Sequence, residues 1–236
     1  MSGWNGGKNA VNHFKKALRA VERKAKKALT MSPVNILERI SIDPPFKKIY
    51  HRLGFKKKTT ELTAQQQKET DLFIEEALSF ITLKGCALRA VIKKNDGSNV
   101  VIVGDVNWES KQLSRFLGDC PEALLMGATA GSAIMEAIAD KTKNDNLSAA
   151  VVYDATASEM TDAALDWLMA YLNSQLRREG KNLLPRRFSA GYGDFKLENQ
   201  KSIHHLLEMQ KIGVAISSNF ILRPEKTVTA ITGIWK

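Results

Sequence analysis

The longest helical pattern in the 236-residue chain covers residues 148–177 and sets the frame for the rest of the fold. Apolar side chains recur along it at spacings of three or four and form one broad face, which includes Val152, Met160, Leu168 and Leu172. Several other members of this face are alanines, and small residues let a neighbouring backbone come near. We therefore expect this helix to pack closely against a sheet or another helix.

Shorter patterns surround this helix in an irregular order. Strand patterns cover residues 34–42, 87–92, 99–103, 122–128 and 214–235, the last interrupted at Pro224. Helix patterns cover residues 44–50, 64–81, 109–117, about 130–141 and 197–209. The turn Asn95-Asp96-Gly97 between two of the strands is a strong hairpin signal. Hairpins mixed with uneven helices, without regular βαβ alternation, predict an α+β fold.

The basic character of the chain is confined to its front end. Residues 1–63 hold 15 Lys and Arg against 4 Asp and Glu, whereas residues 64–236 hold 20 against 21. Residues 11–29 read as a basic amphipathic helix. This helix either contacts an acidic membrane surface, nucleic acid or a partner, or is a solvated appendage. We divide the chain into a basic, partly helical extension over 1–33 and one domain over 34–236.

The sequence lacks the motifs of several common enzyme and cofactor-binding classes. It contains no P-loop, dinucleotide fingerprint, His-Glu-x-x-His motif or nucleophile elbow, so we assign no catalytic residue. The four histidines are scattered and the only cysteines are Cys86 and Cys120, so we expect no metal site. No run approaches the roughly 18 apolar residues of a membrane span, and no secretory signal is recognisable. These features indicate a cytoplasmic protein with two buried free thiols.

Two loops have the composition of ligand sites. The turn at residues 127–131 (Gly-Ala-Thr-Ala-Gly) either presents amides to an anion or only permits close packing. The segment 186–194 is either a plain surface loop or a ligand loop. In the second case the guanidinium of Arg187 would hold a carboxylate, and the small residues Ser189, Ala190 and Gly191 would let a ligand reach the backbone. Tyr192 would add a flat face and a hydroxyl group.

The pattern Arg187-x-x-x-Gly191-Tyr192 resembles the Arg-x-x-x-Gly-Tyr signature of the S-adenosylmethionine-binding activation domain of cobalamin-dependent methionine synthase. Residues 197–207, 213–220 and 224–229 are similar to the segments that follow in that family. Two departures stand out. Gly193 occupies the place of the family's usual proline, and the sequence ends at Lys236, before the family's C-terminal extension. No cobalamin, homocysteine or folate domain is attached, so the resemblance is to a stand-alone module with a separate partner.

The resemblance implies helices around a twisted, mainly antiparallel sheet and a bound S-adenosylmethionine. Arg187 would bind the methionyl carboxylate, Tyr192 would lie near the sulfonium, and the backbone at Ser189 and Gly191 would contact the adenosine. The positively charged ligand needs acids nearby. Our candidates are Asp162 or Glu159 on the long helix, each of which would otherwise be a solvated helix-surface residue.

The resemblance also implies a role and partners. A corrinoid-binding methionine synthase component would carry cobalamin, which occasionally oxidises to the inactive cobalt(II) form. A flavodoxin-like or ferredoxin-like donor would supply one electron, and methyl transfer from S-adenosylmethionine would trap the reduced state. The alternative is a non-catalytic binding protein that uses its basic N-terminal helix to engage nucleic acid or an anionic surface. Of the two we expect the first, and no nucleic-acid partner.

Overall fold

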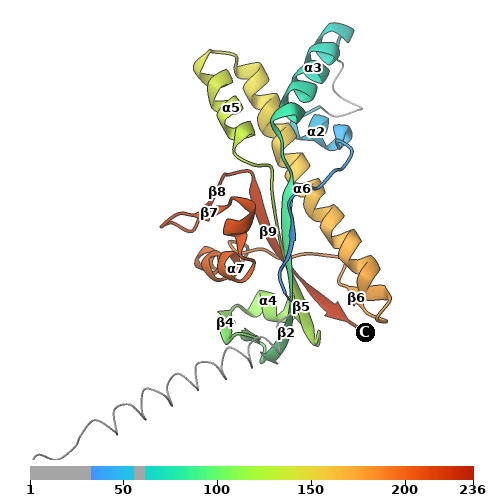
Figure 1. Cartoon of the computed structure of the whole chain (residues 1–236), viewed down its shortest axis with the longest axis vertical. Coiled ribbons are helices and arrows are strands. Elements are labelled where there is room, and N and C mark those ends of the chain that lie inside the picture. Colours follow the sequence, from blue (N-terminus) through green and yellow to red (C-terminus); the bar gives the residue numbers. More distant parts are fainter. Residues whose placement is uncertain (1–32, 56–61) are drawn as a thin grey trace, which may run out of the picture.

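The fold is organised around a curled antiparallel sheet that the long helix α6 (Leu147–Arg177) crosses on one face (Figure 1). This computed structural model describes residues 33–55 and 62–236. The predicted basic helix at 11–29 lies outside the described residues, as does nearly all of the extension over 1–33. The α+β class and the mainly antiparallel sheet predicted from the sequence are both confirmed.

The main sheet has the strand order β4-β3-β2-β5-β9-β6, and every pairing in it is antiparallel. The strands are β4 (Val106–Glu109), β3 (Asn99–Ile102), β2 (Lys84–Asn95), β5 (Glu122–Thr129), β9 (Thr227–Trp235) and β6 (Asn182–Leu183). A further short strand, β1 (Asn35–Leu37), pairs with the first half of β2. Strand β5 is buried along nearly its whole length because it lies between β2 and β9.

Helices cover one face of this sheet, with α6 directly upon it. Alanines of α6 at 149, 157 and 164 are fully buried in this layer, as their small size predicted. The contact is so close that a Cβ atom on Gly85 of β2 would stand 2.9 Å from side-chain methyl groups of Leu168 and Ile40. Helices α2 (Phe46–Arg52), α3 (Ala64–Phe80) and α5 (Ala133–Lys143) pack in turn against α6.

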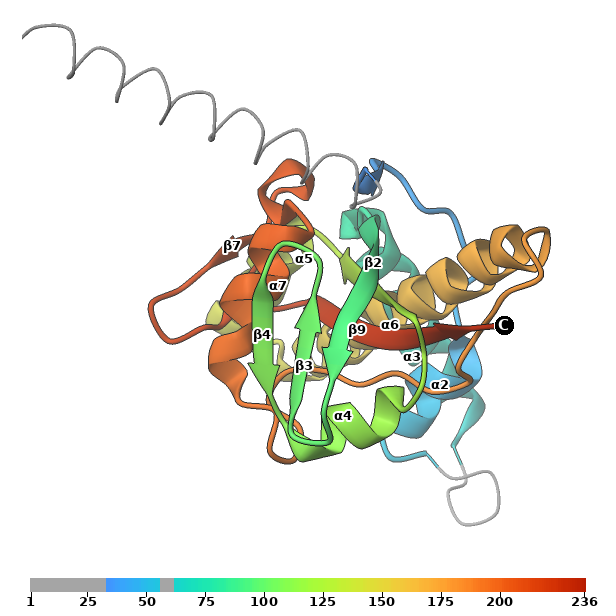
Figure 2. The same cartoon turned by 90° about the horizontal axis from the view of Figure 1, so that it is seen from below.

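The opposite face is covered by shorter elements. Figure 2 shows β2, β3 and β4 side by side, with α4 (Lys111–Leu117) and α7 (Gln200–Leu206) nearby. Trp108 and Phe195 are fully buried in this second core, with their ring centroids 5.7 Å apart in an edge-on arrangement. Because residues alternate between faces along a strand, Leu124 of β5 joins the α6 core whereas Leu125 joins this one.

The C-terminal quarter differs most from the prediction. The single helix expected over 197–209 is broken into a 3-10 turn (Leu197–Asn199), α7 and a second 3-10 turn (Met209–Ile212). Glu208 adopts a left-handed conformation with φ 50°, which ends the helical course and turns Met209 into the core. The short strand predicted within residues 34–42 is formed at Asn35–Leu37. The segment predicted as a loop at 179–196 contains the short strand β6.

Both cysteines are buried and neither is in a disulfide, as expected. Burial raises the pKa of Cys86 to about 12. In the part of the chain that the structure describes, no helix is long and apolar enough to cross a membrane, and no cluster of His, Cys, Asp or Glu is arranged to hold a metal ion.

Candidate functional site

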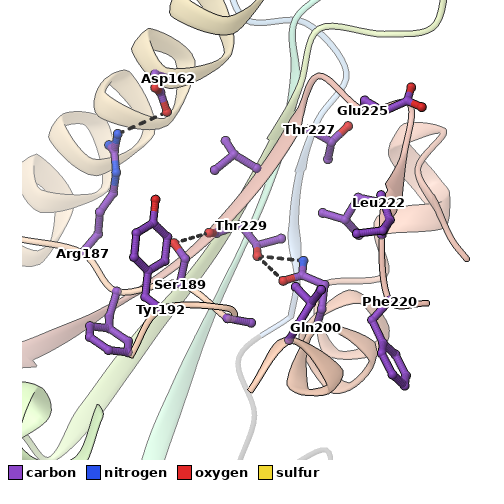
Figure 3. Close-up of a pocket in the computed structure, with 15 residues that line it drawn as sticks. Asp162, Arg187, Ser189, Tyr192, Gln200, Phe220, Leu222, Glu225, Thr227 and Thr229 are labelled. Atoms are coloured by element: carbon purple, nitrogen blue, oxygen red, sulfur yellow. Dashed lines mark hydrogen bonds and ion pairs between the residues drawn. The ribbon is translucent and has the colours of Figure 1, made fainter. Parts of the chain in front are cut away.

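A cleft with a volume of about 590 Å³ opens beside the edge of β9, between α6 and the small hairpin of β7 (Ala215–Ile216) and β8 (Leu222–Arg223) (Figure 3). Small-molecule sites typically measure roughly 300–1,000 Å³, so the cleft is large enough for a nucleoside-sized ligand. Its lining comes from four parts of the chain: Asp162; Arg187, Phe188, Ser189, Ala190, Tyr192, Leu197 and Gln200; Phe220, Ile221 and Leu222; and Glu225, Thr227, Val228 and Thr229.

The loop that carries Arg187 is fastened to β9 and then leaves it. Phe188 exchanges backbone hydrogen bonds with Ile231, at 2.8 and 2.7 Å. One residue later, the Ser189 hydroxyl group donates to the backbone oxygen of Thr229 at 2.8 Å, in place of a backbone pairing. As a result, the N–H and C=O groups of Ala190 have no hydrogen-bond partner among the described residues. Ala190 lines the cleft, so an unpaired main-chain donor and acceptor belong to a residue of its wall.

The next turn holds Tyr192 at the mouth of the cleft. Gly191 has a φ of 91° and donates its N–H to the Phe195 oxygen at 2.7 Å. The carboxylate of Asp194 accepts hydrogen bonds from the backbone N–H groups that begin α4, at 2.8 Å from Lys111, and from the Ser110 hydroxyl group. These donors lower the pKa of Asp194, the hydroxyl group most. Between the two anchors, Tyr192 remains 68% exposed.

The guanidinium of Arg187 lies against two acids of α6. Its Nη2 is 3.6 Å from Oδ1 of Asp162, and its Nη1 pairs with Asp166. Asp162 and Asp166 are four residues apart and therefore share one face of the helix. Figure 3 shows Arg187 and Asp162 pointing toward each other on the α6 side of the cleft.

Two cations of helix α2 pair with the acids of α6 that lie beside Arg187 or near it. Lys48 Nζ lies 3.1 Å from Oδ2 of Asp166. Arg52 Nε lies 2.6 Å from Oε1 of Glu159, and its Nη2 lies 3.8 Å from Oδ2 of Asp162. The acids of α6 are thus shared between cations of α2 and Arg187.

A buried polar pair forms the floor of the cleft. The Nε2 atom of Gln200 lies 2.8 Å from the Thr229 hydroxyl oxygen, and the Oε1 atom of Gln200 lies 3.0 Å from the same oxygen (Figure 3). Both residues are buried, and they join α7 to β9.

The far wall carries a third acid. Glu225 lines the cleft and pairs with Arg223. The neighbouring Lys226 fixes this segment to α6, with its Nζ 2.6 Å from Oδ1 of Asp154 and 2.9 Å from the Ser158 hydroxyl oxygen.

The structure brings most of the residues proposed from the sequence to this one cleft. Arg187, Ser189, Ala190, Tyr192 and Asp162 all line it. Gly191 belongs to the same loop but does not line the cleft, since it provides the turn. The alternative acid, Glu159, does not line it either, because its 12%-exposed side chain faces Arg52.

Other lining residues were not singled out from the sequence. Glu225 and Thr229 lie within segment 224–229, and Gln200 lies within 197–207. Both segments belonged to the resemblance, which indicated their neighbourhood but not the individual side chains. Nothing in the sequence indicated that Lys48 and Arg52 of α2 would meet the acids of α6.

The glycine-rich turn at 127–131 is a packing feature. A Cβ atom on Gly127 would stand 2.9 Å from the Met209 terminal methyl group and 3.0 Å from the Cys86 sulfur. Of the two readings left open by the sequence, close packing is the one that the structure supports at Gly127.

Comparison with known proteins identifies the fold. No family model matches the chain, and no curated protein matches it in sequence. Among solved structures, it is similar to the MetH reactivation domain bound to AdoHcy, with a TM-score of 0.62 and 12% sequence identity over 85% of this chain and 78% of that chain. The chain therefore has the fold of that reactivation domain, and the resemblance found in its sequence extends to its three-dimensional structure.

Proposed function

We propose that this protein binds S-adenosylmethionine in the cleft beside β9 and supports the reductive methylation of a corrinoid cofactor held by a separate protein. The main support is the meeting of Arg187 and Asp162 at the same cleft as the Ala190 backbone. The solved domain of the same fold carries AdoHcy, which differs from the proposed ligand by one methyl group.

The amino-acid end of the ligand fits the charges beside α6. An α-amino acid presents a carboxylate next to an ammonium group. Arg187 can take the carboxylate with two parallel hydrogen bonds, and Asp162 can take the ammonium. The 3.6 Å between Arg187 and Asp162 places opposite charges side by side, as the ligand does.

The remaining groups fit the nucleoside and the sulfonium. The N–H and C=O of Ala190 offer a donor and an acceptor to the edge of a purine, and Ser189 and Ala190 are small enough for a flat ring to approach. Tyr192 adds an exposed aromatic face at the mouth of the cleft. Asp162 and Glu225 supply negative charge for a ligand that is positive at its sulfonium and ammonium groups.

When bound, S-adenosylmethionine supplies a methyl group to the reduced corrinoid of the partner. The chain itself contributes position and charge: Arg187 and Asp162 hold the amino-acid end, and the 188–192 loop holds the nucleoside. The corrinoid-binding methionine synthase component, a flavodoxin-like or ferredoxin-like electron donor and a cytoplasmic location belong to the same proposal.

Calorimetric titration with S-adenosylmethionine tests the ligand assignment. Arg187→Ala removes a charge-assisted pair, which typically costs about 2–5 kcal/mol when the other charge stays buried, so affinity should fall roughly 30-fold or more. Arg187→Lys should recover little, because lysine offers only a point charge. Arg186→Ala is the matched control, since Arg186 is exposed and does not line the cleft. Equal binding by the parent and by a correctly folded Arg187→Ala variant would refute the site.

A second experiment tests the partner. The chain alone should form no methionine from homocysteine and methyltetrahydrofolate. It should bind a separately produced corrinoid protein, and the affinity should depend on the oxidation state of the cobalt. Turnover of both substrates by the purified chain would contradict the accessory role.

A further inference from the structure

Asp166 occupies an unusual place between two cations. One of its carboxylate oxygens pairs with Nη1 of Arg187, and the other lies 3.1 Å from Nζ of Lys48. Its side chain is 50% exposed and does not line the cleft, whereas Asp162, the other acid beside Arg187, does line it. The two acids that pair with Arg187 therefore stand in different positions relative to the cleft.

In this arrangement, the positive charge of the Arg187 guanidinium is partly balanced by acids before any ligand binds. An incoming carboxylate has to compete for the same guanidinium donors. Arg187 would lose Asp166 at little cost, because exposed ion pairs contribute only about 0–1 kcal/mol. Asp166 would not be left alone either, because Lys48 already pairs with its other oxygen.

We propose that Asp166 is an exchangeable counter-ion of Arg187, and that Lys48 is a positioning residue which keeps it exchangeable. In the free protein, Arg187 is shared between Asp162 and Asp166. When a ligand carboxylate enters, Arg187 gives up Asp166 for it and Asp166 stays with Lys48. This inference rests on the proposed function, and it makes the ion pairs between α2 and α6 a determinant of affinity for ligands that carry a carboxylate.

The opposite role would be that Asp166 only orients Arg187 for the ligand. The two roles predict opposite changes in ligand affinity when Asp166 is removed. If Asp166 competes, its removal strengthens binding; if it orients, its removal weakens binding. Asp162 also contacts Arg187, so the guanidinium keeps one acidic neighbour after Asp166 is lost.

The test titrates S-adenosylhomocysteine, which has the carboxylate, and 5′-methylthioadenosine, which lacks it. Asp166→Asn should bind S-adenosylhomocysteine about two- to fivefold more tightly, the range set by an exposed ion pair. Lys48→Met should bind it more weakly by a similar factor, because Asp166 then depends on Arg187 alone. Adding Lys48→Met to Asp166→Asn should have no further effect. Neither variant should change the affinity for 5′-methylthioadenosine.

Two control variants remove charge without touching the network. Lys47→Met changes an exposed neighbour of Lys48 on the same helix, and Glu136→Gln neutralises an exposed acid of α5. Both should bind like the parent. Unchanged or weaker binding of S-adenosylhomocysteine by Asp166→Asn would refute the proposed exchange of Asp166 and would leave the proposed ligand site standing. A parent that binds neither adenosyl ligand would overturn the proposed function and the exchange with it.

Discussion

The buried pair of Gln200 and Thr229 offers a sharp test of how the floor of the cleft is held. Replacing Thr229 by valine keeps the shape of the side chain and removes its hydroxyl group. That hydroxyl group lies 2.8 Å from Nε2 and 3.0 Å from Oε1 of the Gln200 amide. The single change therefore deprives both polar atoms of a buried side chain of the same partner.

The size of the effect follows from the cost of unpaired buried groups. Leaving a buried donor or acceptor unsatisfied costs about 1–3 kcal/mol. We expect Thr229→Val to lower the free energy of unfolding by about 2 kcal/mol, which lowers Tm by roughly 4–8 °C in a domain of this size. Replacing both partners, with Gln200→Leu and Thr229→Val together, removes the unpaired atoms. The double variant should thus be more stable than the sum of the two single losses predicts, by about 0.5–3 kcal/mol.

Urea unfolding of the parent, both single variants and the double variant measures this coupling. Thr142→Val on α5 is the control, since that position is exposed and threonine and valine have similar helix propensities. Its free energy of unfolding should stay within about 0.5 kcal/mol of the parent. Strict additivity of the two single losses would show that Gln200 and Thr229 do not depend on each other.

Three further predictions concern other parts of the chain. Gly193→Pro should lower the free energy of unfolding by more than about 1 kcal/mol in urea titration, because the φ of 57° is closed to proline; an unchanged midpoint would contradict this. Burial opposes ionisation of Glu122, but hydrogen bonds from Arg89 and Lys181 outweigh it and lower its pKa below the usual 4.5. The parent should therefore have a higher free energy of unfolding than Glu122→Gln. This difference should be complete above about pH 4.5 and should vanish as the pH falls through the lowered pKa. A difference in the free energy of unfolding that does not narrow in acid would refute the prediction. A chain beginning at Met31 should melt within a few degrees of the full chain, because the cores of the described residues begin at Val34; loss of cooperative melting would show that the first 30 residues belong to the core.

The parts of the fold that the sequence predicted well have a strong local cause. The apolar spacing of α6, the capping box of Thr63 and Gln66 at the start of α3, and the turn between β2 and β3 are all set by neighbouring residues. The break after α7 is different. Glu208 is left-handed there because the chain must return Met209 to the sheet, and no short-range pattern records that demand.

The same distinction between local and long-range causes applies to the candidate site. Arg187 and Tyr192 of the sequence motif line the same cleft, because both belong to one loop. The motif could not choose between Glu159 and Asp162, since both occur on exposed turns of the predicted helix. The difference depends on Arg52, a residue more than 100 positions away, which lies 2.6 Å from Glu159 but 3.8 Å from Asp162, and only Asp162 lines the cleft. Charge pairing between distant helices is a property of the tertiary structure.

Gly193 holds the turn after Tyr192 in a conformation that is closed to proline. Gly193 adopts a left-handed φ that proline cannot reach, and a Cβ atom there would collide with the Gln112 side chain. This conformation brings Asp194 to the start of α4, where it accepts hydrogen bonds from two backbone N–H groups and from Ser110. The turn that carries Tyr192 is thus anchored by the Asp194 side chain at the start of a neighbouring helix. A substitution at Asp194 should therefore disturb the mouth of the cleft even though Asp194 does not line it.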